Sequence, residues 1–170
     1  MRQDTSDIAQ SVDINAILKS AISLVSNMIN KSTDHFSIKY GKNLPVLKGN
    51  FQQLEQVMIN LIQNACQALL DKTKGISVST SFEKQSHTIR VRIEDEGKGV
   101  PSENLPHITD PLFTTKQESG GVGLGLSISS RIVQEHGGTM TFTSEHGKGT
   151  TAEVALPVTK INNTLEEIEK

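Results

Sequence analysis

The sequence NLIQNACQAL, residues 60–69, places two asparagines four positions apart in an apolar run that has helical spacing. Asn60, Asn64 and Gln67 are spaced i, i+4 and i+7, so in a helix over residues 51–71 they lie along one line. The three amides either hydrogen-bond a neighbouring loop or line a polar cavity, where an amide oxygen would suit Mg²⁺ as a ligand. At about 100° per residue they border a wide apolar arc, whose members are Leu54, Val57, Met58, Leu61, Ala65, Ala68 and Leu69.

The segments on either side of this helix predict an α+β fold. Apolar spacing predicts a helix over residues 13–29 with Asp13 as its N-cap, and another from about residue 123 to His136. Alternating apolar residues predict strands over 35–40, 76–82, 88–95, 139–145 and 150–158. We expect a two-layer α/β sandwich, with three main helices on one face of a mixed, mostly antiparallel sheet of five or six strands.

One folded domain is expected over residues 13–158. Residues 1–12 have the composition of a tail or linker, and residues 159–170 form a polar, charged tail. Within the domain, residues 96–121 contain Pro101, Pro106 and Pro111 and end in the sequence ESGG. This irregular stretch is longer than the ~12–15 residues of an ordinary connection, which indicates either a functional loop or a disordered one.

Composition limits the functional classes open to the 170-residue chain. Its 17 Lys and Arg against 19 Asp and Glu give a net charge of −2, which argues against a broad nucleic-acid surface. The only cysteine, Cys66, rules out an internal disulfide and fits a reducing compartment. No apolar run approaches the ~20 residues of a membrane span. We therefore expect a cytoplasmic domain without membrane contact, although it could belong to a larger, membrane-anchored protein.

The strand predicted over residues 88–95 ends in a carboxylate. Its apolar residues occupy alternate positions, and Asp95 shares their inward face. An inward carboxylate needs hydrogen-bond donors, which the amino group of a planar base would supply. Gly97 and Gly99 follow and would let the backbone approach such a base closely. The alternative is an ordinary turn that starts at an aspartate before glycine.

A cluster of glycines stands before the helix predicted from about residue 123. The unpaired N–H groups and partial positive charge of a helix N-terminus attract phosphate. Neither the P-loop pattern nor the dinucleotide-binding pattern of glycines occurs in the chain. The glycines predict a phosphate site of another kind, or else only a flexible loop, and they are Gly120, Gly121, Gly123 and Gly125.

The order of five segments closely resembles the ATP-binding catalytic domain of bacterial sensor histidine kinases. NLIQNACQAL matches that family's N box, DEGKGVP its first glycine box and DPLFTTK its phenylalanine box. GGVGLGLSISSRIVQEHGGTM matches the second glycine box, and GKGTTAEVALP the third glycine segment. The resemblance covers residues 50–157, and QNACQAL and PLFTTK look most like the nitrogen-regulation branch. The same superfamily includes gyrase, heat-shock chaperone and mismatch-repair ATPases.

The resemblance implies ATP and Mg²⁺ as cofactors and a role for each matched position of the first two boxes. Asp95 would accept a hydrogen bond from the adenine amino group. Asn64 would coordinate magnesium through its side-chain oxygen, and Asn60, the implied catalytic residue, would contact the phosphates or a metal-bound water. Gln67 stands near the phosphates where many relatives have Lys or His, so its neutral amide weakens any claim that this position supplies charge.

The remaining boxes imply a lid over about residues 100–122 and further contacts with the nucleotide. Phe113 and Lys116 would belong to that lid, with Lys116 a candidate cation for the γ-phosphate. Thr150 would lie near the adenine. The other matched positions would border the base or wrap the phosphates, and they are Gly97, Gly99, Val100, Gly121, Gly123, Leu124, Gly125 and Leu126.

The sequence differs from the related ATPases at Asn60 and departs from the kinase pattern at two positions of the later boxes. Where the related ATPases have a water-activating glutamate, four residues before the metal-binding Asn64, this chain has Asn60. An amide cannot act as a general base, so ATP hydrolysis should be slow and the nucleotide kept for another nucleophile. Lys98 occurs where an aliphatic residue is usual, and Leu112 replaces the first phenylalanine of the usual pair.

None of the five histidines has the H-E/D-x-x-[NT] setting of a phosphoacceptor. The resemblance therefore implies a protein histidine kinase domain that phosphorylates a histidine on a separate dimerisation and phosphotransfer domain, with residues 1–12 leading from it. A response-regulator receiver domain would be an indirect partner. The parent protein is expected to be a homodimer, while this chain could be a monomer. The alternatives are a serine kinase of the anti-sigma-factor type and a non-catalytic nucleotide-binding module.

Overall fold

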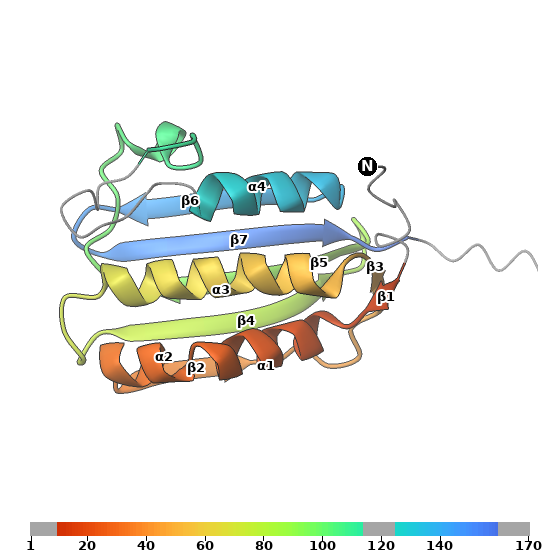
Figure 1. Ribbon diagram of the computed structural model, residues 1–170, viewed down its shortest axis with the longest axis horizontal. Helices are drawn as coiled ribbons and strands as arrows, with labels where there is room; N and C mark the ends of the chain where they lie inside the picture. Colours follow the sequence, from red (N-terminus) through yellow and green to blue (C-terminus); the bar gives the residue numbers. More distant parts are fainter. Residues whose placement is uncertain (1–9, 114–124, 160–170) are drawn as a thin grey trace, which may run out of the picture.

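Helices cover one face of a five-stranded sheet in the computed structural model, which describes residues 10–113 and 125–159 (Figure 1). The long helix α3 (Phe51–Ala68) contacts β5 and lies between α1 (Ile14–Leu24) and α4 (Gly125–Glu135). The short helix α2 (Ser26–Ser32) continues from α1. This arrangement confirms the predicted two-layer α+β sandwich.

The sheet has the strand order β2-β4-β5-β7-β6. β2 pairs with β4 in parallel, and every other neighbouring pair is antiparallel, as predicted for a mixed sheet. β7 lies between β5 and β6, and the register places Asp95 of β5 directly opposite Thr150 of β7. The strands are β2 (His35–Lys39), β4 (Gly75–Glu83), β5 (Thr88–Asp95), β6 (Thr139–Glu145) and β7 (Gly149–Pro157).

Three local features differ from the sequence prediction. The helix expected over residues 13–29 is divided at Val25, whose φ of −105° and ψ of 13° separate α1 from α2. α3 ends at Ala68 instead of residue 71, because Leu69 has extended backbone angles. A small antiparallel ribbon of β1 (Ser11–Val12) and β3 (Leu47–Lys48) was not predicted. A 3-10 turn, η2 (Leu105–His107), lies in the long loop.

Side-chain caps begin the two long N-terminal helices. The Asp13 carboxylate accepts from the backbone N–H groups of Asn15 at 2.9 Å and Ala16 at 3.3 Å, as expected of an N-cap. The Asn50 side chain accepts from the N–H of Gln53 at 2.9 Å and caps α3. These bonds satisfy N–H groups that have no partner inside a helix, so they set where α1 and α3 begin.

The core lies between α3 and the helix-facing side of the sheet. The predicted apolar arc of α3 is buried up to Ala65, while Ala68 and Leu69 are half-buried at the helix end. The opposite face of the sheet is polar, and Arg90 there pairs with Glu83 at 2.7 Å and with Glu153 at 2.5 Å. Within the described residues, no helix combines the length and apolarity needed to cross a bilayer.

Candidate functional site

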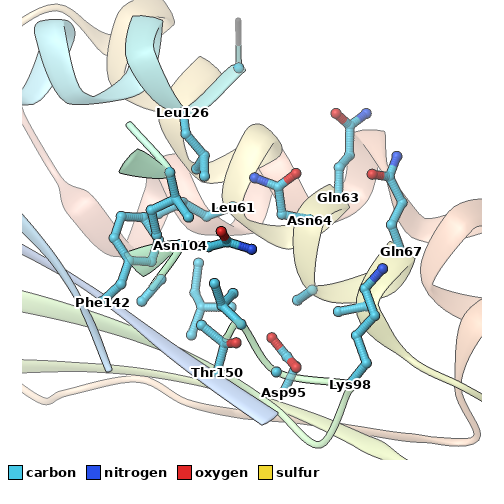
Figure 2. A pocket seen from close by; sticks show the side chains of 18 of the residues that line it. Leu61, Gln63, Asn64, Gln67, Asp95, Lys98, Asn104, Leu126, Phe142 and Thr150 are labelled. Carbon is cyan, nitrogen blue, oxygen red and sulfur yellow. The ribbon is translucent and has the colours of Figure 1, made fainter. Parts of the chain in front are cut away.

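A cavity of about 570 Å³ opens between α3, the ends of β5 and β7, and the loop that follows β5 (Figure 2). This volume is in the range of pockets that hold small molecules. The structure brings together most of the predicted site residues here, namely Asn60, Asn64, Gln67, Asp95, Gly99, Val100, Phe113, Gly125, Leu126 and Thr150. The predicted residues Lys116, Gly121, Gly123 and Leu124 lie outside the described part of the chain.

Asp95 occupies the end of β5 at the wall of the cavity, where Figure 2 shows its carboxylate. One carboxylate oxygen accepts a hydrogen bond from the Gly97 N–H at 2.9 Å. The side chain is half-buried and shares the helix-facing side of β5 with buried apolar residues. Asp95 is the only carboxylate among the described residues that line the cavity, so it sets the acceptor chemistry of that wall.

Ser144, for which no sequence pattern predicted a role, fixes the residues beside Asp95. Its hydroxyl oxygen accepts from the Val100 N–H at 2.7 Å and donates to the Gly149 carbonyl at 2.9 Å. Because that donor is already used, the hydroxyl of Thr150, 2.9 Å away, donates to Ser144. The hydroxyl oxygen of Thr150 is thereby held at the cavity wall, opposite Asp95 in the register of the sheet.

The loop after β5 is attached on both sides through its backbone. The Lys98 N–H donates to the Ala68 carbonyl at the end of α3 at 3.0 Å, and the Lys98 carbonyl accepts from the Gly147 N–H at 2.7 Å. Gly97 does not line the cavity; it lies so close to α3 that an added Cβ would be 2.5 Å from the Ala68 carbonyl oxygen. Gly99 has a φ of 71°, a conformation that glycine adopts without strain.

Asn60 connects α3 with the start of α4. Its side-chain nitrogen donates to the hydroxyl of Ser129 at 3.0 Å and to the carbonyl of Gly125 at 3.3 Å. Asn60, Gly125 and Leu126 all line the cavity. The residue proposed from sequence to act on phosphates therefore also positions the first turn of α4 at the cavity.

The amide row of α3 lies along the cavity as the helical spacing predicted. Figure 2 shows the amide of Asn64 beside the cavity, while the side chains of Gln63 and Gln67, which also line it, extend away from Asp95. Among the described residues, no group of three or more His, Cys, Asp or Glu side chains could hold a metal ion. Mg²⁺ usually keeps several waters and takes one or two protein oxygens, so the neutral side-chain oxygen of Asn64 fits such an ion.

Several lining residues were not assigned to the site from sequence. Among the apolar ones, Leu61, Ile93 and Phe142 had only a core signal because they belong to amphipathic elements. Asn104 enters from the long loop, and Figure 2 shows its amide inside the cavity. Leu112, by contrast, is 66% exposed and does not line the cavity, although its neighbour Phe113 does.

Comparisons with known proteins identify the family to which the chain is similar. Residues 49–160 match the family model described as histidine kinase-, DNA gyrase B-, and HSP90-like ATPase. The sensor histidine kinase ZraS of Escherichia coli (strain K12) is 35% identical over 149 residues, 88% of this chain and 31% of that protein. The sensory histidine kinase/phosphatase NtrB of Rhizobium meliloti (strain 1021) is 37% identical over 134 residues, 71% of this chain and 34% of that protein. The chain thus spans about a third of the length of these relatives.

Solved structures share the fold. The catalytic domain of the histidine kinase ThkA superposes with a TM-score of 0.75 at 27% identity, covering 87% of this chain and 96% of that one. The mycobacterial sensor histidine kinase MprB has a TM-score of 0.76 at 21% identity over 88% of this chain and 97% of that one. At 21% identity, the likeness to MprB concerns the fold alone.

Proposed function

This chain belongs to the histidine kinase-, DNA gyrase B- and HSP90-like ATPase family, and we propose that its cavity binds ATP with magnesium for transfer of the γ-phosphate to a histidine of another domain. The matches to sensor histidine kinases, NtrB among them, confirm the resemblance found in the sequence. The observation that carries the proposal is the single carboxylate of Asp95 among the described residues of a cavity that is lined mainly by apolar side chains and neutral amides.

Asp95 gives the cavity a preference for adenine. The carboxylate accepts from Gly97 through one oxygen and would accept from the amino group of the base as well, because each carboxylate oxygen has two lone pairs. Guanine carries a carbonyl at the corresponding ring position, and its oxygen would face the same negative charge. Leu61, Ile93 and Ala152 supply the apolar surface on which the flat faces of a base can pack.

The triphosphate would extend from the base toward the amide edge of α3 and the start of α4. Asn64 would hold Mg²⁺ through its side-chain oxygen, and bound magnesium would neutralise charge that develops on the transferred phosphoryl group. Asn60 keeps Gly125 and Leu126 in place on the other side. These residues bind and orient, which is most of what phosphoryl transfer requires of a protein.

Slow hydrolysis follows from the same residues. The amide of Asn60 cannot remove a proton from water, and its nitrogen is already engaged with α4. Asp95, the only carboxylate of the described lining, would be occupied by the base. Bound ATP is therefore retained until a nucleophile arrives, and we propose that this nucleophile is the histidine of a dimerisation and phosphotransfer domain, from which a response-regulator receiver domain would later take the phosphate.

Calorimetric titration with a non-hydrolysable ATP analogue, with and without magnesium, tests the proposal. The unaltered chain should bind the analogue, Asp95→Asn should abolish binding, and substitution of Asn64 should chiefly weaken the magnesium-dependent part. Asp34→Asn is a matched control, because that exposed carboxylate pairs with Lys72 away from the cavity. Undiminished binding by Asp95→Asn, or rapid ATP turnover by the chain alone, would overturn the assignment.

Phosphate transfer is tested by adding the histidine-bearing domain of the parent protein to the chain and labelled ATP. The label should appear on that domain in a linkage that survives alkali and is lost in acid. An acid-stable label on a serine-containing partner would instead support a serine kinase, and binding without any transfer would support a nucleotide-binding module.

A further inference from the structure

The described lining of the cavity contains very little positive charge for a ligand as anionic as ATP. A triphosphate brings several negative charges, and Asp95 adds another. Lys98 is the only lysine or arginine among the described lining residues, and His146 is the only histidine. The amides of α3 are neutral, so the charge of the phosphates has one permanent protein partner in the described part of the cavity.

Lys98 extends from a backbone that is fixed at two points. Its N–H is bonded to the end of α3 and its carbonyl to the turn between β6 and β7. Figure 2 shows the side chain rising from the loop after β5 toward the end of α3, with its ammonium group on the same side of the cavity as the amide of Gln67. The side chain itself is exposed, so its flexible stem can follow a phosphate.

We propose that Lys98 binds the triphosphate of ATP and is the cation of the α3 side of the cavity, next to Gln67. The inference rests on the proposed function and adds to it a residue that distinguishes ATP from uncharged adenosine. An ammonium that stays partly in water contributes less than a buried one. A charge-assisted hydrogen bond to phosphate at this position should therefore change affinity about fivefold to tenfold.

The competing explanation is purely structural. α3 has no basic residue in its last turn, and a cation near a helix C-terminus stabilises the helix through its dipole. In that case Lys98 would affect the stability of the domain and not the recognition of phosphate. The two explanations differ in which affinity a substitution of Lys98 should change. Adenosine has the base and sugar of ATP without its phosphates, so only a role in phosphate binding would affect ATP and spare adenosine.

The experiment compares the binding of an ATP analogue and of adenosine by Lys98→Met and Lys98→Arg. Lys98→Met should bind the analogue about fivefold to tenfold more weakly and adenosine with unchanged affinity, while Lys98→Arg should bind both normally. Adding Gln67→Lys to Lys98→Met should restore binding of the analogue, because it returns a cation to the same side of the cavity. Lys148→Met is the matched control, since Lys148 pairs with Glu145 at 2.6 Å outside the cavity and should be silent.

Each result has a definite meaning. If the unaltered chain binds neither ligand, the proposed function itself is wrong. If it binds the analogue and Lys98→Met binds it equally well, or loses affinity for adenosine to the same extent, the inference about Lys98 is wrong. A fall in the melting temperature of Lys98→Met without a change in the ratio of the two affinities would favour the role at the helix end and would also overturn the inference.

Discussion

The side-chain nitrogen of Asn60 on α3 lies 3.0 Å from the hydroxyl oxygen of Ser129 on α4 and donates a hydrogen bond to it. Ser129 is completely buried, and a second bond from the same nitrogen reaches the carbonyl of Gly125. A position that sequence assigned to catalysis therefore also holds two helices together. Substitutions of Asn60 will affect the placement of α4 as well as any contact with phosphate.

A double-mutant cycle measures this connection. Asn60→Ala and Ser129→Ala should each lower the free energy of unfolding in urea, and the double variant should lose about 1 kcal/mol less than the sum of the two. Gln63→Ala, on the same helix and also at the cavity, is the control and should combine additively with Ser129→Ala. Strict additivity of Asn60→Ala and Ser129→Ala would mean that the bond contributes nothing.

Gly97→Ala should destabilise the domain and weaken nucleotide binding together. The new methyl group would lie 2.5 Å from the Ala68 carbonyl oxygen and would push the loop away from α3. Overpacking of this kind costs about 1–3 kcal/mol, and the displaced loop carries Lys98 and follows Asp95 directly. Thermal unfolding and titration with an ATP analogue are the measurements.

Gly125→Ala is the control for the effect of Gly97→Ala on stability. Its methyl group would meet Asn60 at 3.8 Å, an ordinary contact, and alanine is favoured over glycine within a helix. The melting temperature should therefore hold or rise. Equal losses of stability in the two glycine variants would contradict the close approach of Gly97 to α3.

Asn104→Ala should weaken binding of an ATP analogue about fivefold, the equivalent of one neutral hydrogen bond. The amide of Asn104 lies inside the cavity and makes no capping bond to η2, so its polar atoms are directed at the ligand space. Glu103→Ala, the exposed neighbour outside the lining, should bind normally. Tighter binding by Asn104→Ala would show instead that the amide obstructs the nucleotide.

Cys66 should resist alkylation in the folded chain. Burial raises the pKa of the thiol, the negative charge of Asp95 raises it further, and a hydrogen bond with Ser32 only partly opposes the rise. A raised pKa leaves less thiolate at any given pH, and thiolate is the reactive form. Timed labelling with iodoacetamide should be slow near neutral pH and should become faster only when the pH exceeds the pKa of an ordinary thiol. Labelling should be fast in urea, where the chain is unfolded. Rapid labelling of the folded chain near neutral pH would contradict the burial.

The same shift sets the direction of a stability change with pH. A group whose pKa is raised by folding contributes stability below its unfolded pKa, and that contribution is lost as the pH rises through the folded value. Relative to Cys66→Ser, the unaltered chain should therefore lose stability in alkali. Because Cys66 is the only cysteine of the chain, the serine variant also gives the labelling background.

The parts of the site that sequence could place depend on short-range periodicity. Alternation along residues 88–95 put Asp95 on the inward face, and helical spacing put Asn60 and Asn64 on one edge of α3; the cavity contains all three. The five-stranded mixed sheet followed from the same patterns. Periodicity works here because each of these side chains is directed by its own element.

The features that sequence missed arise from contacts between distant segments or from backbone geometry. α3 ends at Ala68, where Leu69 takes extended backbone angles, and the Ala68 carbonyl accepts from the N–H of Lys98, thirty residues later. No local sequence signal marks that contact. Apolar spacing continues across Val25, so this pattern does not predict the division between α1 and α2. Asn104 lies in a loop without any period, and its amide reaches the cavity only through the path of that loop.

The late position of β7 in the chain has a consequence for how the protein is made. β7 follows every other described strand in the chain and so leaves the ribosome after them, yet it is inserted between β5 and β6 and supplies Thr150 opposite Asp95. A product that stops before residue 149 would lack an interior strand, which would leave one edge of β5 unpaired and the cavity without Thr150 and Ala152. Premature termination there should yield an aggregating or degraded polypeptide and not a folded domain with reduced affinity for nucleotide.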